Sequence, residues 1–260
     1  VGPIVKDSTK AYLRPETAQS IFSNFKLVYE HSRLRLPCGV AQIGKAFRNE
    51  IAPREFLFRS REFEQMELEY FISPGLHCPK EYMDEIKDVE IALYTSEMQS
   101  SNGKARVMKI YDALKKGIMK VDWHAYWLAT EVKWFLSLGV GLDKLRARQH
   151  THDEKSHYAV DTWDLEYEFP MGWRELQGIA NRGSYDLTQH QDHSKQSMAV
   201  IVDDATGKKV IPEVVCEPSL GVGRAFIVFM LEAYEHDKKR DNVVLHLSPG
   251  LAPYKAAIFP

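Results

Sequence analysis

The stretch from Phe47 to Phe71, FRNEIAPREFLFRSREFEQMELEYF, constrains the fold most, because it predicts two antiparallel strands and the loop between them. The segment IAPREFLF, with Pro53, is typical of a hairpin loop. Successive side chains of a strand point to opposite faces of a sheet. On the first strand, one face would carry Arg48 and Glu50. On the second strand, one face would carry Arg59, Arg61, Phe63, Gln65, Glu67 and Glu69.

The order of charges on this predicted hairpin suggests a ligand with an anionic end and a cationic end. Arg48 and Arg59 would meet over one end, Phe63 would lie under the middle, and Glu67 would reach the other end. Phe63 and Glu67 would be about 14 Å apart, the length of a nucleotide joined to a small molecule. Arginine binds two phosphate oxygens at once, an aromatic ring stacks on a purine, and a carboxylate binds an ammonium group. Spacing alone leaves open a solvated charged strand over an apolar core.

The remaining segments predict an α+β domain with a mainly antiparallel sheet, because strands and helices are mixed without βαβ alternation. Helical patterns occupy residues 15–25, 77–99, 123–139 and 221–237. Strand patterns occupy residues 39–51, 55–72, 157–169, 173–183 and 208–220. Gly139 and Gly141 are expected to end the third of these helices.

Composition excludes several classes of protein. The chain has 260 residues, 44% of them hydrophobic, and a formal net charge of −2. That balance disfavours a generally cationic nucleic-acid-binding surface, although a local basic patch stays possible. Three widely separated cysteines predict neither a disulfide framework nor a zinc site, and no apolar run approaches the roughly 20 residues that span a bilayer. The chain does not begin with Met, so we expect a piece of a longer protein.

Several motifs together resemble the glycyl-tRNA synthetases of the homodimeric type, within the class II aminoacyl-tRNA synthetases. FRNE…RSREFEQMELEYF resembles motif 2 of the class, and EPSLGVGRAFIVFMLEAY resembles motif 3. YLRPETAQSIFSNF, AQIGKAFRNEIAPREF and GWRELQGIANRGSYDL narrow the resemblance to the glycyl family over nearly the whole chain. Gly223 stands where some members carry Asp.

The resemblance implies a fold and a domain plan. It implies an antiparallel sheet of the class II type, flanked by helices, over residues 1–245, with a partly helical insertion at 76–150. VGPIV resembles the segment that follows motif 1, so motif 1 would precede this chain. Residues 246–260 resemble the start of a C-terminal anticodon-binding domain.

The resemblance also implies site residues. Arg48 and Arg224 would be catalytic, and Glu175 would be a possible contact of Mg²⁺. ATP would be bound by Arg48, Glu50, Arg59, Phe63, Glu175, Arg182 and Arg224. Glycine would be bound by Glu16, Arg48, Glu67, Glu217 and Ser219. Three carboxylates repel one another in an empty pocket, so we expect one to be protonated, or neutralised by Arg48 or Arg182, until glycine binds.

The implied activity is that of a glycine–tRNA ligase. ATP would activate glycine to glycyl-adenylate with the help of Mg²⁺, and the 3′ end of tRNA(Gly) would receive it. A cytoplasmic homodimer without membrane contact is expected, with an organellar copy as the alternative location.

Rival interpretations belong to other classes. One is a synthetase-like nucleic-acid-binding protein without catalysis, and another is a class II synthetase for threonine, proline or histidine. His150, His152 and His157 are compatible with a metal site, although their spacing favours a structural role. The basic segment GKARVMKIYDALKKG would contact the tRNA acceptor stem or no RNA at all.

Overall fold

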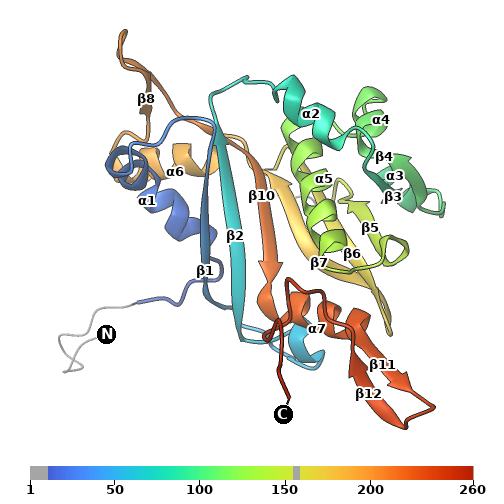
Figure 1. Ribbon diagram of the computed structural model, residues 1–260. Coiled ribbons are helices and arrows are strands. Elements are labelled where there is room, and N and C mark those ends of the chain that lie inside the picture. The colour runs from blue at the N-terminus through green and yellow to red at the C-terminus, as the bar shows by residue number, and fades with distance from the viewer. Residues whose placement is uncertain (1–10, 155–158, 260) are drawn as a thin grey trace, which may run out of the picture.

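The computed structural model describes residues 11–154 and 159–259, and its centre is one eight-stranded sheet (Figure 1). The strands lie in the order β1-β2-β10-β7-β6-β5-β3-β4. They are β1 (Cys38–Phe47), β2 (Glu62–Ile72), β3 (Glu90–Tyr94), β4 (Arg106–Lys109), β5 (Leu145–Gln149), β6 (Asp161–Phe169), β7 (Gly172–Asn181) and β10 (Glu213–Gly221). All neighbouring strands pair antiparallel except β3 and β5, so the expected α+β fold with a mainly antiparallel sheet is confirmed.

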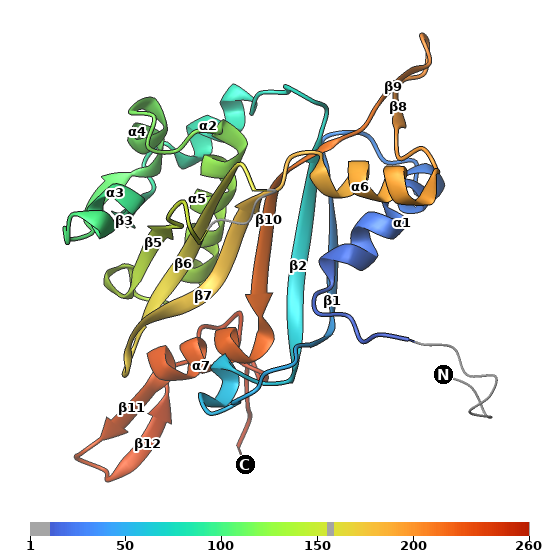
Figure 2. The same ribbon diagram turned by 180° about the vertical axis from the view of Figure 1, so that it is seen from behind.

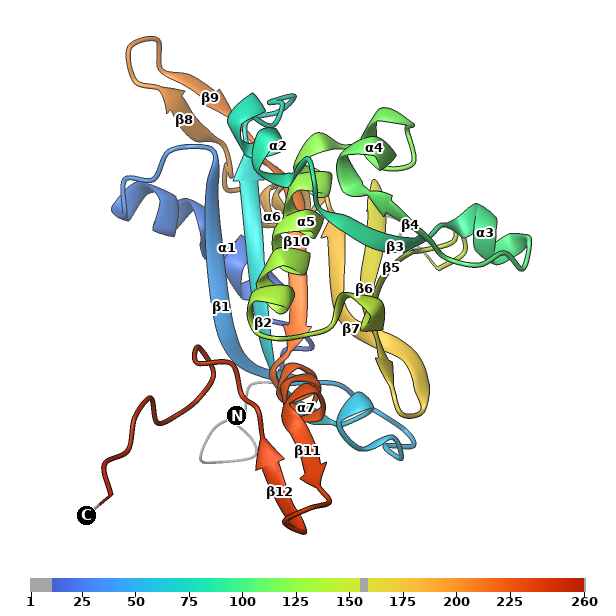
Figure 3. The same cartoon turned by 45° about the vertical axis from the view of Figure 1, so that its right-hand side comes forward.

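Helices cover both faces of this sheet. The long helix α5 (Asp122–Ser137) crosses one face, where it contacts β10 and β7 (Figure 3). Helices α1 (Ala18–His31) and α6 (Tyr185–Ser194) contact each other, and α1 packs on β1 and β2 from the opposite face (Figure 2). Helix α7 (Val222–Ala233) follows β10 directly and lies at the end of the sheet.

The smaller elements lie around this frame. Two separate hairpins are formed by β8 (Val200–Asp203) with β9 (Lys208–Val210), and by β11 (Tyr234–Asp237) with β12 (Asn242–Leu245). The remaining helices are α2 (Lys80–Ile86), α3 (Ser96–Ser100) and α4 (Ile110–Lys115), with short 3₁₀ turns η2 (Phe56–Phe58) and η3 (Leu142–Lys144). Within the described residues, no helix has the length and apolar character needed to cross a bilayer.

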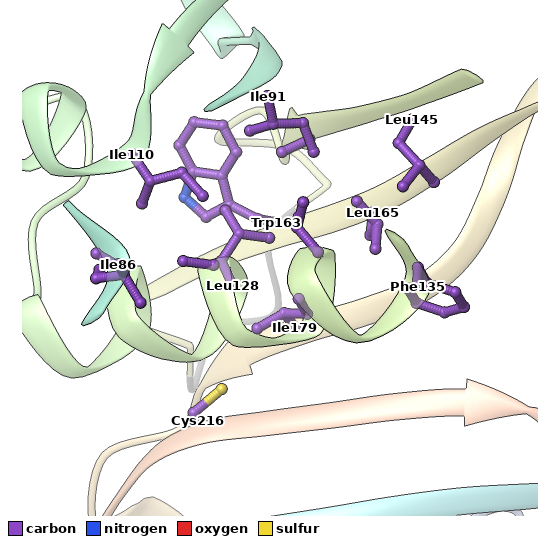
Figure 4. Packing of buried hydrophobic residues seen from close by; sticks show 14 of the residues in the cluster. Ile86, Ile91, Ile110, Leu128, Phe135, Leu145, Trp163, Leu165, Ile179 and Cys216 are labelled. Atoms are coloured by element: carbon purple, nitrogen blue, oxygen red, sulfur yellow. The ribbon is translucent and has the colours of Figure 1, made fainter. Parts of the chain in front are cut away.

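The larger hydrophobic core lies between α5 and the sheet (Figure 4). Leu128 and Phe135 of α5 face Trp163 and Leu165 of β6, and all four side chains are fully buried. A second core lies under α1, where the rings of Phe25 and Phe71 stack at 4.0 Å between centroids. Burial of this apolar surface on both faces holds the sheet rigidly between two helical layers.

Strand β2 belongs to both cores because its side chains alternate. Tyr70 packs against Trp123 and Trp127 on the α5 side, whereas Phe71 packs against α1. The residues on the α1 side are Phe63, Gln65, Glu67, Glu69 and Phe71. Gln65, Glu67 and Glu69 therefore lie on the α1 face, as the alternation predicted.

Several predicted boundaries were wrong. The first strand of the hairpin ends at Phe47, so Arg48 and Glu50 follow it and do not share a strand face. The last predicted helix ends at Ala233, because Tyr234–Asp237 form β11. The second strand of the hairpin begins at Glu62, so Arg59 and Arg61 belong to the loop, where η2 interrupts the extended chain. Residues 77–99 do not form one helix, because Glu90–Tyr94 form β3, whose Ile91 and Leu93 are buried at strand spacing. Residues 208–220 form two strands, β9 and β10.

Other expectations about the chain have mixed outcomes. The hairpin of β1 and β2 and the helix within 123–139 are confirmed, and Gly139 has the positive φ of 97° that favours glycine after a helix. The segment 76–150 is partly helical, and its β3, β4 and β5 join the sheet. The VGPIV segment lies outside the described residues, and an anticodon-binding domain that begins at 246 stays a prediction.

Candidate active site

Seven of the predicted site residues line one cavity of about 380 Å³ at the end of the sheet beside α7. They are Arg48, Glu50, Arg59, Phe63, Glu175, Ser219 and Arg224. They come from the β1–β2 loop, from β2, β7 and β10, and from the first turn of α7. The fold therefore brings together residues that lie up to 176 positions apart in the sequence.

Arg48 is fixed where the chain leaves β1. Its backbone N–H donates to the carbonyl of Arg61 at 3.0 Å, which closes the base of the loop. Its Nε donates to the carbonyl of Pro15 at 3.2 Å. The guanidinium carbon lies 5.2 Å from the centroid of the Phe63 ring, so one cation and one aromatic face share the cavity wall.

Arg224 lies opposite, at the start of α7. Its guanidinium donates to the carbonyl oxygens of Glu175 and Phe58, at 3.0 and 3.2 Å, and lies 3.4 Å from the Glu175 carboxylate. Arg59 is exposed and approaches Glu55 at 3.8 Å. Three arginines therefore face the cavity, beside a helix N-terminus that also favours anions, so the cavity can bind a polyanion.

Glu67 lies deeper, beside the cavity, and is already held by five donors. Its Oε2 accepts from the backbone N–H groups of Thr17 and Ala18, each at 2.7 Å, and from the Thr17 hydroxyl. Its Oε1 accepts from Gln65 Nε2 at 2.7 Å and from Ser219 Oγ at 2.9 Å. Glu67 thus caps the N-terminus of α1 from a neighbouring strand, which fixes the carboxylate before any ligand arrives.

The structure places Arg182 away from the cavity that holds the other predicted ATP ligands. Its Nη1 donates to both carboxylate oxygens of Glu217 at 2.8 Å. Its Nε and Nη2 donate to Asp186 of α6 at 2.7 and 3.0 Å, and Nη2 lies 3.9 Å from Glu16. Arg182 lines a separate cavity of about 930 Å³ at the other end of β7.

Glu16, Glu67, Glu217, Asp186 and Arg182 therefore form one group of charges, which we call the acidic array. Glu16 is partly exposed, and the other four side chains are buried. Burial raises the pKa of Glu217, although the facing guanidinium of Arg182 opposes that shift. Burial disfavours the charge of Arg182, yet the carboxylates of Glu217 and Asp186 raise its pKa. Arg48 and Arg182 were the two cations expected to neutralise the pocket, and Arg182 is the one that contacts its carboxylates.

The sequence reasoning missed two members of this site. Gln65 joins Glu67 to Ser219, since its Nε2 donates to both side chains at 2.7 and 2.6 Å. Its place on the face of Glu67 was predicted, but its partner on β10 was not. Asp186 gave no signal, because the segment that became α6 was not predicted as a helix.

Two metal sites were considered from the sequence, one at the histidines of residues 150–157 and one for Mg²⁺ at Glu175. Within the described residues, no group of three or more His, Cys, Asp or Glu side chains could hold a metal ion. His150 bonds to Asp164 at 2.8 Å, His152 is fully exposed, and His157 lies outside the described residues. Glu175 offers one half-exposed carboxylate at the cavity, which fits Mg²⁺ only if phosphate oxygens complete its shell.

A fold of this kind, with arginines and an aromatic ring above a helix N-terminus, is that of a known family. Residues 4–234 match the model of the tRNA synthetase class II core domain (G, H, P, S and T), and the chain belongs to this family. The class II core predicted from motifs 2 and 3 is therefore confirmed.

The curated relatives that resemble this chain include glycine–tRNA ligases, one of the specificities that this family model covers. The chain is 42% identical to the glycine–tRNA ligase of Geobacillus thermodenitrificans and 40% identical to that of Thermobifida fusca, in each case over its whole length. It covers 47% and 49% of these relatives, so it spans about half their length. A prolyl-tRNA synthetase of Giardia lamblia, solved with prolyl-adenylate, shares 14% identity at a TM-score of 0.49 and covers 83% of this chain and 33% of that one.

Proposed function

We propose that this chain is the catalytic core of a glycine–tRNA ligase, which makes glycyl-adenylate from glycine and ATP and transfers glycine to tRNA(Gly). One observation carries the proposal. A cavity with three arginines and an aromatic ring adjoins the mostly buried acidic array, and Ser219 of the cavity wall donates to Glu67 of the array. The charges of an aminoacyl-adenylate are complementary to this arrangement, because its phosphate is anionic and its ammonium group is cationic.

The residues of the cavity would hold ATP. Arg48 would bind the α-phosphate and the glycine carboxylate, while Arg59 and Arg224 would bind the β- and γ-phosphates. Phe63 would stack on the adenine, and Glu50 would accept from its amino group. Mg²⁺ would be held by Glu175 and phosphate oxygens, where it would neutralise charge on the leaving pyrophosphate.

The acidic array would hold the ammonium group of glycine. Glu16, Glu67 and Glu217 would attract it, and Ser219 with Gln65 would fix the geometry of Glu67. Every competing amino acid is larger than glycine. Because the array is buried and already hydrogen-bonded, it has little freedom to make room for an added methyl group.

Activation would need no general base. An α-carboxyl group titrates near pH 3.5, so the glycine carboxylate is ionised at neutral pH. It would attack the α-phosphorus in line, form the acyl–phosphate bond and expel pyrophosphate. Catalysis would then depend on positioning and on the arginine charges, and a ribose hydroxyl of tRNA would attack the adenylate carbonyl in the second step.

The test is glycine-dependent exchange of pyrophosphate into ATP by the full-length protein, with alanine and serine as controls. Exchange with glycine alone supports the proposal. No exchange with any amino acid, in a protein that still binds RNA or DNA, favours the non-catalytic interpretation. Exchange with threonine, proline or histidine would point to another class II synthetase. A homodimer and a cytoplasmic location are part of the proposal, and the dimer is tested by light scattering.

A further inference from the structure

A fourth glutamate lies behind the acidic array. Glu69 follows Glu67 by two positions on β2 and shares its face of the sheet. Its side chain is fully buried, and among the described residues neither carboxyl oxygen has a hydrogen-bond partner. A buried ionised carboxylate without partners is highly unfavourable, so Glu69 needs a separate explanation.

The surroundings of Glu69 are mainly acidic. Its charged neighbours are Glu67 on β2, Glu217 on β10, Asp186 on α6 and Arg182. The other elements around it are apolar or weakly acidic. Val40 of β1 lies opposite in the register, Phe22 and Phe25 of α1 pack on Phe71, and Cys216 of β10 is a buried thiol. Four buried carboxyl groups therefore lie in one region with the guanidinium of Arg182, which hydrogen-bonds to Glu217 and Asp186.

Hydrogen bonding separates Glu69 from the other three acids. Glu67 accepts from five donors, and Glu217 and Asp186 each accept two bonds from Arg182. Each of these three carboxylates has hydrogen-bond donors that favour its ionised form, although burial still raises the pKa of Glu217 to about 8. Glu69 has no such partner, which makes it the member of the group best suited to hold a proton.

We propose that Glu69 carries a proton while the amino-acid pocket is empty, and that it releases this proton when the ammonium group of glycine binds at the acidic array. The released proton passes to the buffer and leaves an ionised carboxylate behind. The net charge of the site then changes little on binding. This inference rests on the function proposed above, since it takes glycine as the ligand.

The electrostatics of the buried group agree with this assignment. Burial raises the pKa of Glu69 well above its ordinary value, and the charge of Glu217 raises it further, while Arg182 lowers it. A cation bound two residues away along the strand adds a second lowering influence at about 7 Å. Glycine affinity should therefore rise with pH, by at most about tenfold per pH unit.

The experiment is calorimetric titration of the full-length protein with glycine, in phosphate and in Tris buffer, from pH 6 to pH 8.5. The difference in heat between the two buffers gives the number of protons released. We expect up to about one proton per glycine for the wild type, and none for Glu69→Gln, whose affinity should not depend on pH. Glu30→Gln, on the exposed side of α1, is the matched control and should behave as the wild type.

Several results would overturn the inference. One is glycine binding by the wild type without proton release. Another is release by Glu69→Gln equal to that of the wild type, which would place the proton on a group other than Glu69. If Glu69→Gln does not fold, Glu69→Met is the second variant, because an apolar chain of similar length replaces an uncharged acid that makes no hydrogen bonds.

Infrared difference spectra of the wild type give an independent readout. Glycine should remove the carbonyl band of a protonated carboxyl group, and a band that persists would contradict the proposal. Failure of the wild type to bind glycine at all would instead reject the proposed function, and this inference with it.

Discussion

The cavity lined by Arg48 and Arg224 and the acidic array beneath it are adjacent, yet they are built differently. Arg48, Arg59 and Glu175 are exposed, and their contacts are mostly to backbone carbonyl oxygens or to single charges. In the array, Glu67, Glu217 and Arg182 are buried, and each makes several short hydrogen bonds.

The difference matches what each region would bind under the proposed function. Water solvates the exposed arginines, so they are stable without a partner and would be free to change conformation when a phosphate chain binds. Buried charges need partners from the start, because isolation in the interior costs several kcal/mol. The array is therefore fixed by folding, which would suit the proposed selection of the smallest amino acid.

Removal of the shared cation should have the largest effect. Arg182→Met leaves Glu217 and Asp186 buried without their partner, and we expect a loss of about 3–5 kcal/mol in the free energy of unfolding. Urea unfolding of the full-length protein measures it. Arg35→Met, which removes an exposed partner of Asp204, is the control and should change stability by less than about 1 kcal/mol.

Two outcomes would decide whether the array is fixed by charge. The triple variant Arg182→Met, Asp186→Asn, Glu217→Gln should recover much of the loss, because no unpaired charge stays behind. A loss for Arg182→Met as small as that of Arg35→Met would show that the two regions do not differ as described.

In the cavity, Arg48→Ala should affect catalysis and leave the fold intact. The side chain is exposed, so stability should change little, while the rate of glycine-dependent pyrophosphate exchange should fall by about 10²–10³. Steady-state exchange and thermal unfolding are measured on the same sample. An exchange rate within threefold of the wild type would exclude Arg48 from the reaction.

Phe63→Leu should sharpen the comparison, because it keeps an apolar side chain and removes only the ring. Loss of stacking on adenine is worth about 1–3 kcal/mol, so KM for ATP should rise by about 5- to 150-fold. KM for glycine should stay near the wild-type value, since Phe63 lies in the cavity wall. Equal changes in both constants would mean that the cavity and the array do not bind separate parts of the substrates.

The last prediction concerns the pH dependence of stability of the empty protein. The pKa of Glu69 is raised in the folded state, so its contribution to stability is fully present below its unfolded value and is lost as pH rises. Relative to Glu69→Gln, the wild type should lose up to about 1.4 kcal/mol per pH unit above pH 5. A difference in unfolding free energy that does not change between pH 5 and 8 would argue against a buried proton.

The part of the cavity that lies on the β1–β2 hairpin was predicted from local patterns of the sequence. The loop of the hairpin and the alternation of β2 place Arg48, Phe63 and Glu67 within 20 positions of one another, and strand geometry then fixes their relation. Arg224 came instead from the resemblance to motif 3, whose glycine turn opens α7. The second boundary of the hairpin was wrong because a 3₁₀ turn at Phe56–Phe58 has no clear local signature.

Long-range contacts were beyond such patterns. Arg182 was expected to line the nucleotide site, but its guanidinium hydrogen-bonds to Glu217, 35 positions away, and to Asp186 on a helix that was not predicted. Residues 77–99 were expected to be helical, yet the edge of the sheet recruits Glu90–Tyr94 as a strand. Tertiary pairing overrides a weak local preference in such segments.

The sequence by itself determined the class of fold and the motif 2 hairpin, because these depend on strand period and on turns between neighbouring segments. Only the tertiary structure decided which charges share the interior. Glu67 caps a helix 50 positions away, Arg182 joins two acids, and Glu69 lies behind them without a described partner. The physical reason is that the free energy of a buried charge depends on what surrounds it in space, and no local pattern of residues specifies those surroundings.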